Sequence, residues 1–204
     1  AGSRSGRDES GGPAIETRLV LPLDLAPLPD GRLIVVEQGT RLLRALATAP
    51  AAAAPVKAPV TYVPPAASLA LAPPIPADPV AEVFAGRGEP GFDGEGSPRL
   101  DSLFGSPRGL ATDGQGRLLI ADTGNHRIRR IEFDGTVRSI AGTGEPGFAG
   151  DGGPATAAQV NRPSDVVVDS AGSILIADAG NFRLRRIDRE GTITTLAGGP
   201  QPGS

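Results

Sequence analysis

The sequence predicts an all-β protein built from tandem repeats of four short strands. Two observations lead to this prediction. Residues 107–147 match residues 163–203 at a constant offset of 56, with 19 of 41 positions identical. Each of these repeats also contains four short apolar runs separated by Gly, Asp and Asn, which are turn residues. Four antiparallel strands that recur at one period are typical of the blades of a β-propeller.

The strands are clearest in the last repeat, where the turn signals are densest. A connector between repeats matches as well, since residues 86–98 agree with 142–154 at 9 of 13 positions. The middle of the second connector, 154–161, has Pro first and helix formers after it, which predicts one helical turn. The strands predicted in the last repeat are 165–169, 174–177, 183–187 and 192–197.

Residues 1–204 are predicted to form a single unit of three repeats, because 22–46 align with 107–131 at an offset of 85. The larger offset indicates an Ala- and Pro-rich insertion, which we expect to be a flexible loop. The boundaries are 22–106 for repeat 1 with the insertion at 48–76, 107–162 for repeat 2 and 163–204 for repeat 3.

Three blades are too few for a ring of 4–8 blades. We therefore expect half of a six-bladed propeller, completed by further blades of a longer chain or by a second copy. The absence of Met favours the longer chain. Apolar side chains of the last repeat, with Val167, Ile176 and Leu196 as candidates, are expected to be exposed on an uncovered blade.

The repeat pattern resembles the NHL-repeat family. In repeat 2 it comprises Pro107, Gly109, Asp113, Gly116, 119–122, Asn125, Arg127 and Ile128, and in repeat 3 it comprises Pro163, Asp169, Gly172, 175–178, Asn181, Arg183 and Leu184. The connector AGTGEPGFAGDGGPATAAQ is similar to that of bacterial family members, many of them exported. The resemblance implies a propeller, commonly six-bladed, that acts as a binding platform. It also implies an extracytoplasmic location, although some proteins of this fold are lyases or lactonases.

Composition narrows the function classes. A net charge of −3 gives no overall basic surface for nucleic acid. The absence of Cys excludes disulfides and thiolate sites, and a single His leaves little room for a His-based metal site or triad. We expect no catalytic residue, no metal site and no cofactor, and no apolar run is long enough for a transmembrane helix.

A carboxylate, an amide and a guanidinium recur at fixed spacing in two consecutive repeats. A catalytic group is needed once, whereas a hairpin clamp is needed in every blade. Asp and Asn bind nearby backbone in turns, and Arg binds carboxylates. This motif is therefore predicted to be structural: Asp122, Asn125, Arg127, Asp178, Asn181 and Arg183.

The basic strands that contain Arg129 and Arg185 have two interpretations. They form either pairs with neighbouring acidic residues or a positive stripe that binds an anion or nucleic acid, although an aromatic content of 3% leaves few stacking platforms. The positions that vary between repeats within one hairpin, Arg41, His126 and Phe182, are further binding candidates. The Gly-rich loops at 91–96 and 147–152 are predicted to be turns that tuck in a Phe.

These observations predict a non-enzymatic binding platform with a protein or other macromolecular partner. Nucleic acid is a less favoured partner, and no membrane partner is expected. Two alternatives remain: an enzyme of the six-bladed lyase or lactonase kind, and a structural spacer within an exported protein.

Overall fold

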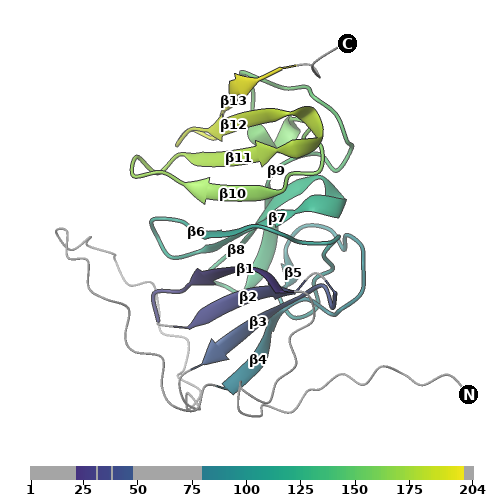
Figure 1. The fold of residues 1–204 in the computed structure, drawn as a ribbon, viewed down its shortest axis with the longest axis vertical. Coiled ribbons are helices and arrows are strands. Elements are labelled where there is room, and N and C mark those ends of the chain that lie inside the picture. The colour runs from purple at the N-terminus through teal and green to yellow at the C-terminus, as the bar shows by residue number, and fades with distance from the viewer. Residues whose placement is uncertain (1–21, 31, 38, 48–79, 200–204) are drawn as a thin grey trace, which may run out of the picture.

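The computed structural model describes residues 22–30, 32–37, 39–47 and 80–199, so the insertion at 48–76 lies outside the described residues. The described residues form three antiparallel sheets, one per repeat, as predicted. We call them blades 1, 2 and 3. In each blade, four strands pair in the order of the chain (Figure 1). No helix in these ranges is long and apolar enough to span a membrane.

Blade 1 comprises β1 (Pro22–Pro27), β2 (Leu33–Glu37), β3 (Leu42–Ala47) and β4 (Val80–Ala85). Blade 2 comprises β6 (Leu110–Thr112), β7 (Leu118–Asp122), β8 (Arg127–Ile131) and β9 (Thr136–Ala141). Blade 3 comprises β10 (Asp165–Val168), β11 (Ile174–Asp178), β12 (Arg183–Ile187) and β13 (Ile193–Gly198). A fifth strand in blade 2, β5 (Ser97–Pro98), comes from the preceding connector and pairs with β9. The sequence did not predict this strand, because two residues are too few to show an alternating apolar pattern.

Short 3₁₀ turns occupy the places where the sequence places turn residues. Two of them, η1 (Thr123–Asn125) and η3 (Ala179–Asn181), join the second and third strands of blades 2 and 3. A third, η2 (Ala155–Ala157), lies in the second connector and confirms the predicted helical turn.

The first strands of the three blades, β1, β6 and β10, lie side by side (Figure 1). Each blade extends outward from this line to its fourth strand, so the blades fan around a common inner edge. The described blades form an arc that does not close into a ring.

Two apolar layers hold the arc together, and β7 contributes to both. Leu118 and Ile120 pack toward blade 1, whereas Leu119 and Ala121 pack toward blade 3, since successive side chains of a strand point to opposite faces. A strand that is buried on both faces reads as a continuous apolar run. This explains why the sequence of 118–121 shows no alternation of apolar and polar residues.

Blade 3 exposes the face that blade 2 buries. The positions that follow Leu119 and Ile128 by 56 residues are Leu175 and Leu184, and Leu184 is 38% exposed while Ile128 is fully buried. On the same blade, the expected exposure of Val167 and Leu196 is confirmed, at 47% and 49%.

The expected exposure of Ile176 was wrong. This side chain is fully buried, because it points from β11 toward blade 2 and packs in the second apolar layer.

Candidate functional site

The arc has two ends of different construction. At one end lie the hairpins that join the second and third strands, and here each connector leaves the fourth strand of its blade; we call it the connector end. At the other lie the turns that join the first strand to the second and the third to the fourth; we call it the turn end. The recurring charged motif lies at the connector end, where β7 and β11 finish.

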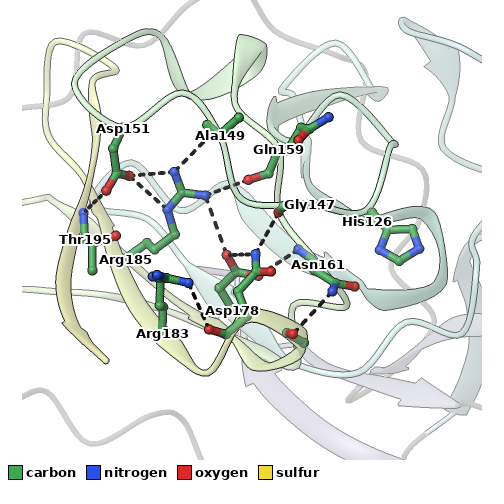
Figure 2. A network of polar contacts seen from close by, with 12 residues as sticks. His126, Gly147, Ala149, Asp151, Gln159, Asn161, Asp178, Arg183, Arg185 and Thr195 are labelled. Carbon is green, nitrogen blue, oxygen red and sulfur yellow. Dashed lines mark hydrogen bonds and ion pairs between the residues drawn. The ribbon is translucent and has the colours of Figure 1, made fainter. Parts of the chain in front are cut away.

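In blade 3, Asp178 is fully buried and receives three contacts (Figure 2). The Asn161 backbone N–H donates to Oδ1 at 2.7 Å, and Asn181 Nδ2 donates to Oδ2 at 2.7 Å. Nη1 of Arg185 lies 3.5 Å from Oδ2. Because Asn181 Nδ2 also donates to the Gly147 carbonyl at 2.7 Å, the carboxylate links its own hairpin to the connector.

Arg185 is fully buried, and its guanidinium donates hydrogen bonds to the connector (Figure 2). Nη2 donates to Oδ1 of Asp151 at 2.6 Å, and Nη1 donates to the Gln159 carbonyl at 2.6 Å. The other oxygen of Asp151 accepts from the Thr195 N–H at 3.0 Å. Desolvation raises the pKa of Asp151, but the hydrogen bonds from Thr195 and Arg185 outweigh it and leave the pKa below its usual value.

Blade 2 repeats this arrangement around Asp122, which is also fully buried. Oδ1 accepts from the Gly105 N–H at 2.7 Å and Oδ2 accepts from Asn125 Nδ2 at 2.7 Å. Nη1 of Arg129 is 3.7 Å from Oδ2, too far for a hydrogen bond. Burial raises the pKa of Asp122 to about 6, and the hydrogen bonds from Asn125 and Gly105 and the charge of Arg129 offset this only in part.

Arg129 and Arg185 differ in how many of their guanidinium N–H groups have a hydrogen-bond partner. Arg129 donates from Nη2 to the Gly94 carbonyl at 3.1 Å, while its Nε and Nη1 have no hydrogen-bond partner among the described residues. Glu95 occupies the position of Asp151 and accepts from the Ser139 N–H at 2.5 Å, as Asp151 does from Thr195. Within the described ranges, no hydrogen bond joins Glu95 to Arg129.

A Phe of each connector lies against two arginines. The guanidinium carbons of Arg183 and Arg185 are 3.6 and 5.0 Å from the centre of the Phe148 ring. Those of Arg127 and Arg129 are 4.1 and 4.7 Å from the centre of the Phe92 ring. These are cation–π distances.

Arg127 also donates to the connector that follows its blade, from Nη1 to the Gly142 carbonyl at 2.7 Å and from Nη2 to the Thr143 carbonyl at 2.6 Å. Its counterpart Arg183 donates to the Asn181 carbonyl at 3.2 Å. Each of the six motif residues thus contacts another residue of the chain.

Blade 1 carries a variant of the same cluster. Glu37 is fully buried, and its Oε2 accepts from Arg44 Nε at 3.0 Å and from Thr40 Oγ1 at 2.6 Å. Sequence reasoning did not predict Arg44 as part of this cluster. The offset of 85 residues, which aligns Arg44 with Arg129, was the available signal.

The three variable positions occupy the tips of equivalent hairpins, one in each blade. Arg41, His126 and Phe182 have φ values of 57°, 53° and 56° and so close their hairpins in the left-handed region. Phe182 is 51% exposed. Nδ1 of His126 accepts from the Arg162 backbone N–H at 3.1 Å, and desolvation, followed by the charge of Arg162, lowers the pKa of this imidazole.

Sequence reasoning missed two arginines beside these hairpins. Arg108 and Arg162 are exposed and line a cavity of about 270 Å³ between η1 and η3. Arg108 lies shortly before the inner strand of blade 2, and Arg162 lies shortly before that of blade 3, so the cavity lies near the common inner edge. Neither arginine repeats, since Ser164 and Ser106 occupy the corresponding positions.

The predicted binding residues therefore separate into two groups. Arg41, His126 and Phe182 lie at hairpin tips of the connector end, whereas Arg129 and Arg185 lie inside the blades with no exposed surface. Within the described residues, no group of three or more His, Cys, Asp or Glu side chains is placed to hold a metal ion.

The fold and the repeated cluster define a β-propeller-type repeat protein. The family model for the NHL repeat matches residues 104–131 and 160–187, so the chain contains two NHL repeats. The two matches cover blades 2 and 3 from the end of the preceding connector to the third strand. The bacterial character of the connector stays a prediction.

Among characterised proteins, the chain is similar to Teneurin-1 of Homo sapiens, with 33% identity over 103 residues, 44% of this chain and 4% of that protein. It is also similar to a probable peptidyl-alpha-hydroxyglycine alpha-amidating lyase of Caenorhabditis elegans, with 30% identity over 92 residues, 45% of this chain and 25% of that protein. The chain thus spans a small part of these relatives.

Solved structures share the fold at low identity. A Bacteroides thetaiotaomicron protein of unknown function superposes with a TM-score of 0.58 at 21% identity, covering 79% of this chain and 34% of the other. A Xanthomonas campestris gluconolactonase gives 0.55 at 15%, covering 89% and 48%. An auxiliary nutrient binding protein of Bacteroides thetaiotaomicron gives 0.55 at 16%, covering 85% and 37%. Because these structures include an enzyme and a binding protein, the fold alone does not decide the function.

Proposed function

We propose that this chain is a non-enzymatic binding platform whose recognition surface is the connector end of the propeller arc. The observation that carries the proposal is the division between repeated and varying positions. The repeated charges of Asp122, Asp178, Arg129 and Arg185 are buried and contact the protein itself. They are therefore engaged in holding connectors to blades and do not face a ligand.

The varying positions have the chemistry of a recognition surface. Phe182 and Arg162 lie at the connector end of blade 3, and His126 and Arg108 lie at that of blade 2. Arg and aromatic side chains are enriched among the residues that dominate binding energy at protein interfaces. Exposed Arg108 and Arg162 favour a protein partner that presents carboxylates opposite them.

The experiment compares variants that are matched within one blade. The immobilised chain is incubated with extract of the source organism, and the retained proteins are quantified for wild type, Arg162→Ala, Phe182→Ala and Arg189→Ala. Arg189 is an exposed arginine at the turn end of blade 3 and serves as the control. We expect one partner to be lost from the first two variants and kept by Arg189→Ala. Equal retention by all four proteins contradicts the proposal, and retention of no partner supports the spacer alternative.

The enzyme alternative rests on the similarity to an amidating lyase and to a gluconolactonase. A screen of the wild-type chain for lactone hydrolysis and lyase turnover separates the two functions. Turnover that disappears in Arg108→Ala but persists in Arg189→Ala replaces the binding proposal with an enzyme at the same end of the arc.

A further inference from the structure

A second cavity lies at the turn end, between blades 1 and 2, away from the surface of the proposed function. Its volume is about 370 Å³, within the range of small-molecule sites. Leu28, Phe84, Leu118 and Ile131 supply apolar walls from both blades. Phe133, in the turn after β8, also lines the cavity and is 71% exposed.

Arg99, at the edge of this cavity, departs from the plan of the repeat. The residue in the same position of the next connector is Ala155, which is buried in the apolar layer between blades 2 and 3. Arg99 instead donates from Nη1 to the Phe84 carbonyl, and its guanidinium carbon lies 4.5 Å from the centre of the Phe84 ring. The blade architecture therefore does not require an arginine here.

The other arginines of the cavity already have carboxylate partners. Arg32 is 2.8 Å from Asp30, and Arg117 is 2.8 Å from Asp113. In the described part of the chain, no carboxylate lies within ion-pair distance of Arg99. Desolvation lowers the pKa of Arg99, and the positive charge of Arg32 lowers it further against a weaker opposing effect of Glu82.

An anion beside Arg99 would offset both the desolvation of its guanidinium and the repulsion from Arg32. The guanidinium is a planar donor whose geometry matches a carboxylate, and the structure shows one hydrogen bond from it, to the Phe84 carbonyl. Asp30 and Glu132 line the same cavity and disfavour a ligand with a second negative charge. The walls meanwhile offer apolar surface to an aromatic or aliphatic body.

We propose that the cavity between blades 1 and 2 binds a small monocarboxylate with an apolar or aromatic body, with Arg99 holding the carboxylate and Phe84 and Phe133 contacting the body. The site does not depend on the connector end. Loss of partner binding there leaves this proposal intact, and the reverse also holds.

Isothermal titration calorimetry of the full chain tests the proposal with three probes: 3-phenylpropionate, its uncharged amide and inorganic phosphate. We expect 3-phenylpropionate to bind with a Kd on the order of 1 mM, as befits a fragment of this size. The amide and phosphate should bind at least about ten-fold more weakly, because one lacks the charge and the other lacks the apolar body and carries a second charge.

Two variants and one control locate the binding. Arg99→Gln should weaken 3-phenylpropionate binding about ten-fold. Arg186→Gln, which removes an exposed arginine of blade 3, should leave it unchanged. Because Arg99 also binds the Phe84 carbonyl, Phe133→Ala provides a second variant whose wild-type side chain is mostly exposed and whose loss should weaken binding several-fold. Equal binding of acid and amide, unchanged binding by Arg99→Gln and Phe133→Ala, or no binding by the wild type overturns the proposal.

Discussion

Asp151 and Arg185 form a hydrogen-bonded ion pair, 2.6 Å from Oδ1 to Nη2, across a separation of 34 residues. The carboxylate comes from a Gly-rich connector and the guanidinium from the middle of β12. Arg185 is fully buried, so the pair neutralises a charge that water does not reach. The preceding connector presents Glu95 in the same position, without a hydrogen bond to Arg129 among the described residues.

Asp151→Ala should lower the free energy of unfolding by about 1–3 kcal/mol, because it leaves a buried guanidinium without its charged acceptor. Glu95→Ala is the matched control, since both carboxylates accept from a backbone N–H of the fourth strand and differ in the contact with arginine. We expect Glu95→Ala to lower the free energy of unfolding, measured in urea, by clearly less than Asp151→Ala does. Equal losses of unfolding free energy in the two variants would show that the contact between Asp151 and Arg185 contributes nothing to stability.

Stability should also depend on pH through Asp122. Its pKa rises from 3.8 to about 6 on folding, so the folded state binds this proton more tightly than the unfolded state. The part of the stability that comes from binding this proton is therefore full below about pH 4, falls as pH rises toward about 6 and is absent above that value. Asp122→Asn cannot titrate and provides the reference.

The measurement is the difference in unfolding free energy between wild type and Asp122→Asn across this pH range. We expect the wild type to lose stability relative to the variant from about pH 4 to about pH 6, with no further change by pH 8. A difference that stays flat, or that moves in favour of the wild type, would contradict a raised pKa.

The uncovered face of blade 3 should make the chain self-associate. Val167, Leu184 and Leu196 are exposed there, whereas blade 2 buries the equivalent face against its neighbour. We expect light scattering coupled to size exclusion to show dimers or larger species, and Val167→Lys with Leu196→Lys to shift them toward the single-chain mass of 20.6 kDa. A wild-type chain that elutes as a monodisperse monomer would show that this face is stable in water.

The strand boundaries were predictable from sequence because turn residues lie just before and just after each strand. The strand at 183–187 has the predicted bounds, since Asn181 precedes it and the turn at Asp188–Gly191 follows it. The strand at 165–169 ends one residue earlier than predicted, at Val168, where the turn begins. Local turn chemistry fixes such boundaries to within a residue or two.

The direction of each arginine side chain was not predictable in the same way. In the run from Arg127 to Ile131, both faces of the strand pack against a blade, so the apolar residues show no simple alternation. Arg129 enters the interior because a carboxylate seven residues earlier and a connector loop 35 residues earlier meet it there. Contacts of that range depend on how the connector folds back, which the period of the sequence does not encode.

The central claim is that repeated charges build the blades and varying positions are free for recognition. Urea unfolding of four variants at pH 7 tests it most directly: Asp122→Ala, Asp178→Ala, Arg162→Ala and Phe182→Ala. The account predicts that the two Asp variants each lose about 1–3 kcal/mol, because each leaves a backbone N–H, of Gly105 or of Asn161, without its acceptor. It predicts that the other two stay within about 0.5 kcal/mol of the wild type, as surface substitutions do. A loss at Arg162 or Phe182 as large as that at the two Asp positions would contradict it.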